Sequence, residues 1–359
     1  MKALSMLDVI FLGTSSATPT PRRNVSSLAL LTKKESLLLD AGEGTQRQIL
    51  HSGFRRGRID RILITHLHGD HIYGLIGLLT SFQLNKREEP LLLAGPAGLA
   101  RYVDFMKRLS QTDFAYELNI EEWDRLTEPT PVLETDDYVL TAAPLRHRLY
   151  TLGYRLEEKP RLGRFDAARA GELGVPFGPE RGLLLRGETV TLADGRVVRP
   201  EDLVGEARPG TVLAFCTDTS YCANSVALAR NADLLIHEAT FLPEDAAQAR
   251  RTLHSTTADA VRVAHEAEVK HLALTHFSTR YMGDSRPLQE AAEAAWPGVI
   301  LARDFLQIHV RAGEAPVLCD SRDSRQTAGG EADPAQAAER SRSRQGGRKR
   351  LDPKDPACG

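Results

Sequence analysis

The chain has 359 residues with a formal net charge of -2, and 42% of the residues are hydrophobic. This length allows one large domain or two small ones around a sizeable core. The balanced charge excludes a histone-like or acidic-tail protein, so nucleic-acid binding would require local patches. No uncharged stretch of 18 residues occurs, and the four cysteines follow neither a Cys-x-x-Cys pattern nor a dense disulfide framework. We therefore expect a soluble, cytoplasmic protein with reduced thiols and no membrane partner.

The N-terminal part contains a polar loop between predicted strands. The loop, residues 14–24, is rich in hydroxyl groups and ends in Arg22, Arg23 and Asn24. It is either an ordinary surface loop or a contact for RNA phosphate, because a guanidinium group matches phosphate oxygens. Apolar runs predict three buried strands, with a hairpin between the second and the third: residues 9–13, 27–32 and 36–41.

Residues 40–46 follow the third strand and open a predicted helix, where backbone amides and hydroxyl groups favour anions. Asp40 has two interpretations at this position. It either caps the helix or orients a metal-bound histidine from behind.

Three histidines and an aspartate follow the next apolar run, where a strand pattern changes to a helical one. His66 and His68 share one face of an extended segment and can bind one cation. If a helix begins at Gly69, Asp70 and His71 lie about 3 to 4 Å further on, which is the spacing of two-metal hydrolytic sites. The pattern predicts a site for two metal ions, and the alternative is a cluster of solvated or capping histidines.

Strand and helix patterns then alternate in βαβ fashion. Residues 72–84 have helical apolar spacing, residues 91–94 predict a strand, and a second helix extends to about residue 109. Another strand, residues 138–143, leads to His147. A lone histidine is usually a surface or core residue, but its position at a strand end favours a ligand.

Residues 157–209 differ in composition from the segments before them, because they are rich in Gly, Pro, Arg and Glu and have few long apolar runs. We predict an insertion that projects from the body of the protein. Its arginines could contact successive phosphates of a nucleic-acid backbone. The alternative is a solvated insertion that binds no partner.

Polar residues also follow the later strands. Asp218 lies at a strand end, where a carboxylate could bridge two cations. His237 and Glu238 follow the next strand, His254 precedes a predicted helix, and His276 ends the last strand. Four strand ends thus carry His or Asp, as sites at the carboxyl edge of α/β sheets require. The apolar runs behind this prediction are residues 211–219, 232–240 and 272–278.

The C-terminal part changes character from about residue 313, and residues 320–359 contain hardly any apolar side chains. We therefore predict one globular domain over residues 1–312 and a disordered basic tail over residues 313–359. The basic stretch 340–354 is either solvated or in non-specific contact with RNA.

Together these residues resemble the metallo-β-lactamase superfamily and, within it, the ribonuclease Z family of tRNA 3′-processing endonucleases. The motif from His66 to His71 supports the superfamily alone. The segment 174–179 resembles the flexible arm of the family. The narrower resemblance covers residues 7–311 and rests on several segments: Gly13-Thr14, Pro19, Arg23-Asn24, residues 39–46, 81–96, 237–240, 254–256 and 274–281.

The resemblance implies an α/β fold, an αββα sandwich in which two stacked sheets flanked by helices hold two zinc ions along one edge, with manganese as the alternative metal. The first loop has Pro21 where relatives often carry a basic residue, which leaves phosphate contact to Arg22 or Arg23. Carried over by position, His66, His68 and His147 would bind one ion, Asp70, His71 and His276 the other, and Asp218 both.

The resemblance also implies that a homodimer removes the 3′ trailer from precursor tRNA, leaving a tRNA 3′-hydroxyl and a 5′-phosphorylated trailer. Asp70 would accept the proton of the attacking water. His254, oriented by Glu238, would protonate the leaving oxygen or steady the phosphate. Asp40, His237 and Glu238 would support the site, although the last two could instead be a structural pair. Six residues are weaker candidates for contacts with RNA: Arg22, Arg23, Thr45, Gly178, Pro179 and Arg280.

Two other functions remain open. A hydrolase of the same fold that acts on small substrates, such as a phosphodiesterase, an arylsulfatase or a lactamase, would need no arm. A non-catalytic RNA-binding subunit would need no metal, and the complete set of expected ligands argues against it. Metal analysis separates the last alternative from an enzyme.

Overall fold

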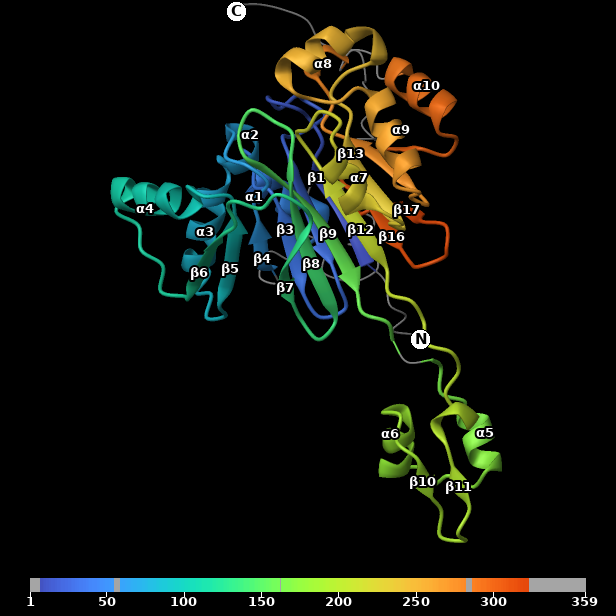
Figure 1. Ribbon diagram of the computed structural model, residues 1–359. Helices are drawn as coiled ribbons and strands as arrows, with labels where there is room; N and C mark the ends of the chain where they lie inside the picture. Colours follow the sequence, from blue (N-terminus) through green and yellow to red (C-terminus); the bar gives the residue numbers. More distant parts are fainter. Residues whose placement is uncertain (1–6, 55–58, 162, 282–285, 323–359) are drawn as a thin grey trace, which may run out of the picture.

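Apolar runs of the sequence form two mixed β-sheets that pack face to face in the computed structural model (Figure 1), which describes residues 7–54, 59–161, 163–281 and 286–322. The first sheet has the order β17-β16-β1-β2-β3-β4-β5-β6, and the second has the order β15-β14-β13-β12-β9-β8-β7. The first sheet comprises β1 (Leu7–Gly13), β2 (Ser27–Leu31), β3 (Ser36–Leu39), β4 (Ile59–Leu63), β5 (Leu91–Gly95), β6 (Leu118–Glu122), β16 (Leu306–Val310) and β17 (Val317–Asp320). The second comprises β7 (Thr130–Glu134), β8 (Tyr138–Leu145), β9 (Thr151–Glu158), β12 (Val212–Cys216), β13 (Leu234–Glu238), β14 (Leu272–Thr275) and β15 (Ile300–Leu301).

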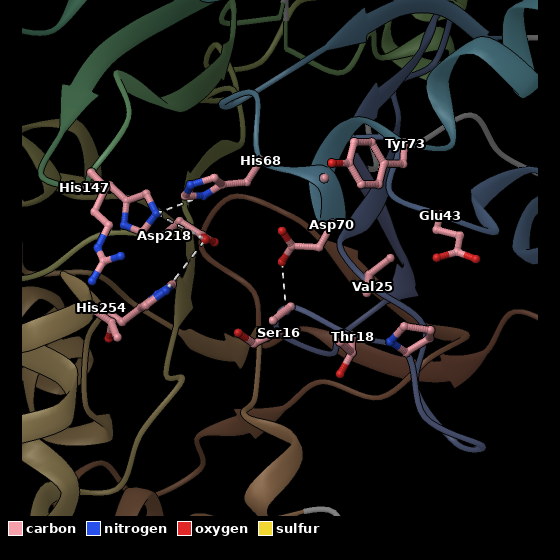
Figure 2. A pocket seen from close by; sticks show the side chains of 15 residues that line it. Ser16, Thr18, Val25, Glu43, His68, Asp70, Tyr73, His147, Asp218 and His254 are labelled. Carbon is pink, nitrogen blue, oxygen red and sulfur yellow. Dashed lines mark hydrogen bonds and ion pairs between the residues drawn. The ribbon is translucent and has the colours of Figure 1, made fainter.

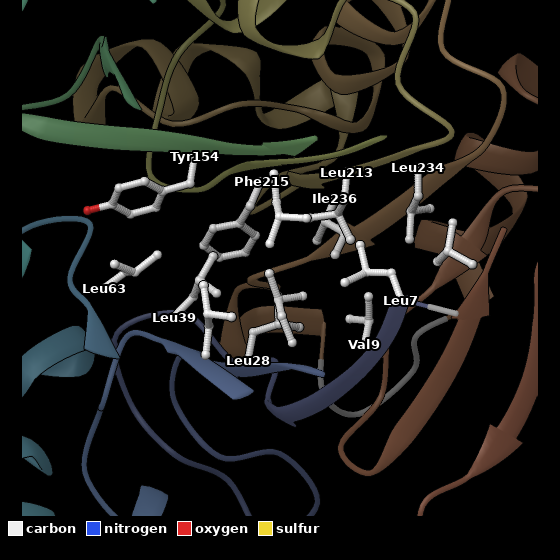
Figure 3. Packing of buried hydrophobic residues seen from close by; sticks show 14 of the residues in the cluster. Leu7, Val9, Leu28, Leu39, Leu63, Tyr154, Leu213, Phe215, Leu234 and Ile236 are labelled. Carbon is white, nitrogen blue, oxygen red and sulfur yellow. The ribbon is translucent and has the colours of Figure 1, made fainter. Parts of the chain in front are cut away.

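The main core lies between the two sheets. Side chains alternate between the two faces of each strand, so one face of every central strand can point into this core. Leu28 and Leu39 of the first sheet face Tyr154, Phe215 and Ile236 of the second (Figure 3), and all five are buried. This packing fixes the two sheets relative to each other and therefore aligns the ends of their strands.

Helices cover the outer faces of both sheets, which confirms the predicted αββα arrangement. Ile10 and Leu12 belong to an apolar cluster with the helices outside the first sheet, and Ala214 and Leu235 to a cluster outside the second. None of the described helices is long and apolar enough to cross a membrane. The helices of the sandwich are α1 (Thr45–Ser52), α2 (Gly69–Ile72), α3 (Leu75–Leu84), α4 (Leu99–Ser110), α7 (Ala223–Ala229), α8 (Ala246–Thr252), α9 (Thr257–Glu266) and α10 (Arg286–Ala295), with short 3-10 turns η3 (Pro243–Asp245) and η4 (Thr279–Tyr281).

The segment between β9 and β12 lies away from the sandwich (Figure 1). We call residues 159–211 the arm. Its two ends lie side by side, because the backbones of Arg161 and Arg208 pair. A small apolar cluster that includes Val175, Leu184 and Val198 gives the arm its own core. Its elements are α5 (Ala167–Glu172), α6 (Pro179–Leu185), β10 (Val190–Thr191), β11 (Val197–Val198) and the 3-10 turn η2 (Pro200–Asp202).

The helical spacing of residues 72–84 corresponds to α3 from Leu75 to Leu84, with a break after α2, which ends at Ile72. The break lets the amide of Gly74 donate to the carbonyl of Ala41 at 2.8 Å. A Cβ atom at Gly74 would lie 2.1 Å from the carbonyl oxygen of Gly42, so only glycine permits this close approach.

The predicted start of a disordered tail at residue 313 is wrong. β17 pairs in antiparallel register with β16, for example Ile308 with Leu318, and extends the first sheet. The strand satisfies backbone groups of β16 that would otherwise form an exposed sheet edge. The remaining predicted tail, residues 323–359, lies outside the described residues.

Candidate metal centre

The candidate metal centre lies at the edge of the sandwich where strands of both sheets end (Figure 2). The first sheet contributes residues after β4, and the second contributes residues after β8, β12 and β14. These residues form two groups that share Asp218, and the ligand atoms within each group lie within 4.8 Å of one another. The structure thus brings together all seven predicted ligands: His66, His68, Asp70, His71, His147, Asp218 and His276.

The carboxylate of Asp218 lies between the two groups. Its Oδ2 is 3.5 Å from Nε2 of His66 and 3.8 Å from Nε2 of His147. Its Oδ1 is 3.2 Å from Nε2 of His71 and 3.1 Å from Nε2 of His276. Each oxygen therefore faces a different group of potential ligands.

His68 and Asp70 complete the two groups. Nδ1 of His68 lies 2.9 Å from Nε2 of His66. Oδ2 of Asp70 lies 3.5 Å from Nε2 of His276 and accepts a hydrogen bond of 2.8 Å from the backbone amide of Ala17. The polar loop after β1 thus holds a predicted ligand in place.

Three site residues at strand ends have a left-handed backbone. The φ angles are 60° at Asp40, 51° at Asp218 and 59° at His276. Residues other than glycine occupy this region at a conformational cost, and they do so mostly where function requires it. The conformation turns the chain sharply after each strand.

Asp40 holds the segment from Thr65 to His71 in place through hydrogen bonds. It is fully buried, and it accepts hydrogen bonds from the amide of Thr65 at 2.7 Å and from Nδ1 of His71 at 2.7 Å. Gly44 is the N-cap residue of α1, so the interpretation of Asp40 as a helix cap is wrong. The hydroxyl of Thr65 donates to Asp40 and lies 3.0 Å from Nδ1 of His66. Both histidines therefore direct Nε2 into the cluster.

Glu238 holds His276 and His254 in the same way. The hydroxyl of Thr240 donates to the buried Glu238 carboxylate at 2.6 Å and lies 3.0 Å from Nδ1 of His276. Nδ1 of His254 donates to Oε1 of Glu238 at 2.8 Å, which leaves Nε2 of His254 4.0 Å from Asp218. Burial alone would lower the pKa of His254, but the Glu238 carboxylate raises it to about 9.

His237 has a different environment. It is fully buried, and its Nδ1 donates to the backbone carbonyl of Glu238 at 2.7 Å. This contact makes His237 a support for the strand end that carries Glu238.

The cluster fits a pair of divalent cations. Nε2 of His71 and of His276 are buried, and neither has a hydrogen-bond partner among the described residues. Burial would raise the pKa of Asp218, but the surrounding histidines hold it well below its usual value. Burial would lower the pKa of His71, but Asp218, Asp70 and Asp40 raise it well above its usual value. The site therefore stabilises positive charge, and its nitrogen and oxygen donors suit zinc and also manganese.

A cavity of about 490 Å³ opens onto the cluster, and His254 lies in its wall (Figure 2). Several residues of this wall were not predicted from the sequence. Tyr73 has 69% of its surface exposed, and Arg148 directly follows His147. Their positions next to predicted ligands were the only sequence signal that could have identified them.

Two of the residues predicted to contact RNA, Arg23 and Thr45, are half-buried and fully buried, respectively. The guanidinium of Arg23 donates to the hydroxyl of Thr14 at 2.7 Å and to the carbonyl of Ala302 at 2.6 Å, so it is engaged within the fold. Thr45 is fully buried. Arg22 is exposed on the same loop and stays a candidate.

Three other candidates lie outside the wall of the cavity. Arg280 is partly exposed and pairs with Asp245 at 2.7 Å. Gly178 and Pro179 begin α6 in the arm. Any RNA contact of these residues would therefore lie outside this cavity.

Asp304, which the sequence analysis also missed, anchors the loop that holds Asp70. Its carboxylate accepts hydrogen bonds from the hydroxyl of Thr14 and the amide of Asn24, both at 2.7 Å, and from the Gln48 amide at 2.8 Å. Burial outweighs these hydrogen bonds and raises the pKa of Asp304 to about 6.

We expect the free energy of unfolding to depend on the ionisation of Asp304. Between pH 4 and 6 the folded state retains a proton that the unfolded state has lost, so stability falls as the pH rises, by up to roughly 3 kcal/mol. The Asp304→Asn variant cannot ionise and should lack this fall. Urea unfolding of both proteins at pH 4.5 and pH 7 measures the difference, and parallel pH dependences would contradict the assignment.

Comparisons with known proteins place these features in context. Family models match in two places, "Anti-Pycsar protein Apyc1" over residues 7–101 and "Beta-lactamase superfamily domain" over residues 203–277. The chain is 46% identical over 310 residues to a ribonuclease Z of Acaryochloris marina, covering 85% of this chain and 98% of that protein. It is 44% identical over 318 residues to a ribonuclease Z of Nostoc sp., covering 87% and 98%.

Two solved structures are also similar. The short form of human tRNase Z has 28% identity and a TM-score of 0.62, and the match covers 85% of this chain and 99% of that one. A diphosphatase from the PhnP family has 19% identity and a TM-score of 0.54, with 84% and 96% covered. The second likeness concerns the fold alone.

Proposed function

Since the chain belongs to the ribonuclease Z family, we propose that it cleaves precursor tRNA at the start of the 3′ trailer, leaving a 3′-hydroxyl on the tRNA and a 5′-phosphate on the trailer. The chain is an endoribonuclease of the ribonuclease Z type. The observation that carries the proposal is the position of Asp218 between two groups of ligands beside an open cavity.

The first group would hold one divalent cation and the second group the other, and the chemistry that such a pair supplies is acidification of water and neutralisation of charge on a phosphate. We propose zinc for both positions, with manganese as the alternative. The residues are His66, His68 and His147 for one ion, Asp70, His71 and His276 for the other, and Asp218 for both.

Two residues of the chain are placed to move protons. Oδ2 of Asp70 faces the second group and lies in the wall of the cavity, so Asp70 accepts the proton of the attacking water. The Glu238 carboxylate raises the pKa of His254 to about 9 and leaves its Nε2 directed at the cavity. His254 therefore donates a proton to the leaving 3′-oxygen.

The arm would contact the tRNA away from the cut. Phe177 at its surface is 90% exposed, and the guanidinium of Arg181 lies 3.7 Å from the centre of the Phe177 ring. Gly178 and Pro179 follow directly and begin α6. An exposed aromatic ring beside a cation offers stacking and phosphate contact without requiring a defined base sequence.

We also propose a homodimer in which the arm of one subunit serves the site of the other. β9 starts near the metal cluster and ends at the arm, and β12 runs back from the arm towards Asp218. The arm therefore joins the end of the sandwich opposite its own site. Exposed apolar side chains on α3 and α4, namely Leu84, Phe105 and Leu109, offer a surface for the second copy.

Replacing residues 162–207 by a short Gly/Ser linker is expected to abolish precursor-tRNA cleavage and to leave hydrolysis of a small phosphodiester unchanged. The adjacent backbones of Arg161 and Arg208 allow this closure without strain on β9 or β12. Parallel assays with precursor tRNA and bis(p-nitrophenyl) phosphate measure the two activities. Equal loss of both would show that the arm is structural and would remove its assignment to RNA binding.

The overall proposal is tested by incubating the protein with precursor tRNAs that carry or lack an encoded CCA and mapping both product ends. We expect one cut, a tRNA 3′-hydroxyl and a trailer 5′-phosphate. Freshly purified protein with less than about one zinc per chain, and no gain in activity with zinc or manganese, would contradict the proposal.

A further inference from the structure

Three polar side chains lie in a row on the outer face of the first sheet, where β1, β16 and β17 are neighbours. Asp8 of β1 is directly opposite His309 of β16, and Cys319 of β17 is opposite Gln307 of β16. Side chains at opposed positions of antiparallel strands share one face. The row of Asp8, His309 and Cys319 therefore points to the same side of the sheet as Gln307. That side is opposite the main core, into which Ile308 points.

The row has the order thiol, imidazole, carboxylate. Nδ1 of His309 donates to Oδ1 of Asp8 at 2.7 Å, and Nε2 of His309 lies 3.3 Å from Sγ of Cys319. The side-chain amide of Gln307 donates to Oδ2 of Asp8 at 3.2 Å and holds the carboxylate in place. With Nδ1–H directed at Asp8, Nε2 carries the lone pair that can accept the thiol proton.

This arrangement does not suit a metal ion. The two nitrogens of His309 point in opposite directions, towards Asp8 and towards Cys319. The three side chains therefore cannot converge on one cation. A nucleophile, a base and an acid that orients the base are arranged in such a line in activated thiol and hydroxyl groups.

The row is also accessible. His309 and Asp8 are 23% and 22% exposed, and Cys319 is half-buried. A reactive cysteine requires partial exposure together with a neighbouring base. The other two described cysteines have different environments. Cys216 is buried, which raises the pKa of its thiol. Cys222 is half-buried, and its Sγ lies 3.8 Å from the hydroxyl of Thr219.

We propose that Cys319 is an activated thiol that forms mixed disulfides with disulfides of low-molecular-mass thiols. The site is separate from the metal cluster, because Asp8 lies at the start of β1 and the loop that contacts Asp70 follows the end of this strand.

The reaction needs no oxidant other than the incoming disulfide. The thiol proton of Cys319 passes to Nε2 of His309, and the thiolate attacks one sulfur of the incoming disulfide. One sulfur–sulfur bond forms to Cys319 as the original one breaks, and the leaving thiolate takes the proton back from His309. The products are the mixed disulfide and one free low-molecular-mass thiol.

The test uses the full-length chain with the Cys358→Ser substitution, because Cys358 lies outside the described residues. Samples are treated with oxidised glutathione, and modification of Cys319 and Cys222 is followed over time by mass spectrometry of peptides. We expect Cys319 to react at least about tenfold faster than Cys222, and His309→Gln to remove this advantage. Asp8→Asn should lower the rate at Cys319 by less than His309→Gln does.

Cys222 in the same sample is the internal control for the amount and quality of protein. A variant that loosened β17 would expose Cys319 and raise its rate, so a lower rate in His309→Gln cannot result from unfolding. Equal rates for Cys319 and Cys222, or an unchanged or higher rate at Cys319 in His309→Gln, would overturn the proposal.

Discussion

Asp218→Asn is expected to lower precursor-tRNA cleavage by about three orders of magnitude or more and to reduce the amount of bound metal. Both oxygens of Asp218 are used, one towards each group of ligands. An amide has the same shape but presents one nitrogen that donates hydrogen bonds, so one group loses its shared ligand and the bridge loses its charge. Cleavage rates and metal content by mass spectrometry measure the two effects.

Asp137→Asn is the matched control for this change. Asp137 pairs with Lys34 on the surface, and its backbone is in the turn between β7 and β8. We expect normal metal content and cleavage in the control. An Asp218→Asn protein with two metal ions and normal cleavage would rule out the bridging role.

His254→Gln is expected to slow precursor-tRNA cleavage by about 10²- to 10⁴-fold while the metal content stays the same. His254 contacts Glu238 through Nδ1, and its Nε2 is farther from Asp218 than the Nε2 atoms of four predicted ligands, namely His66, His71, His147 and His276. The loss should therefore come from proton donation to the leaving oxygen. Single-turnover cleavage under saturating enzyme measures this step without product release.

A second substrate separates proton donation from phosphate binding. The leaving group of bis(p-nitrophenyl) phosphate is a weak base and needs no proton, so His254→Gln should hydrolyse it nearly as fast as the parent protein does. Equal losses with both substrates would mean that His254 holds the phosphate. Glu238→Gln should give the same pattern with a smaller effect, because it acts through the orientation and charge of His254.

The sequence predicted which residues come together in the candidate metal centre, because they follow strands with strong apolar patterns. His147, Asp218 and His276 each lie just after such a strand, and strand ends meet at one edge of the sandwich. The environment of Arg23 could not be predicted in this way. Whether Arg23 faces solvent or Asp304 depends on a contact 281 positions away, and the spacing of nearby residues carries no information on it.

Several strands escaped prediction for a related reason. β6 and β7 lie at the edges of the two sheets, and their exposed positions carry polar residues such as Asn119 and Glu134. Their apolar pattern is therefore weak, although the partner strand supplies the hydrogen bonds. β17 is similar, since Val317 and Leu318 are exposed and the strand is defined by its pairing with β16.

The attachment of the arm has a consequence for enzyme kinetics. β9 spans eight residues between the metal cluster and the arm, about 25 Å of extended chain. A single subunit would then bind tRNA and cut it with surfaces that face apart, and only the proposed dimer would bring an arm and a site together. Mass action should make the specific activity on precursor tRNA fall on dilution, whereas the activity on a small phosphodiester stays proportional to enzyme concentration.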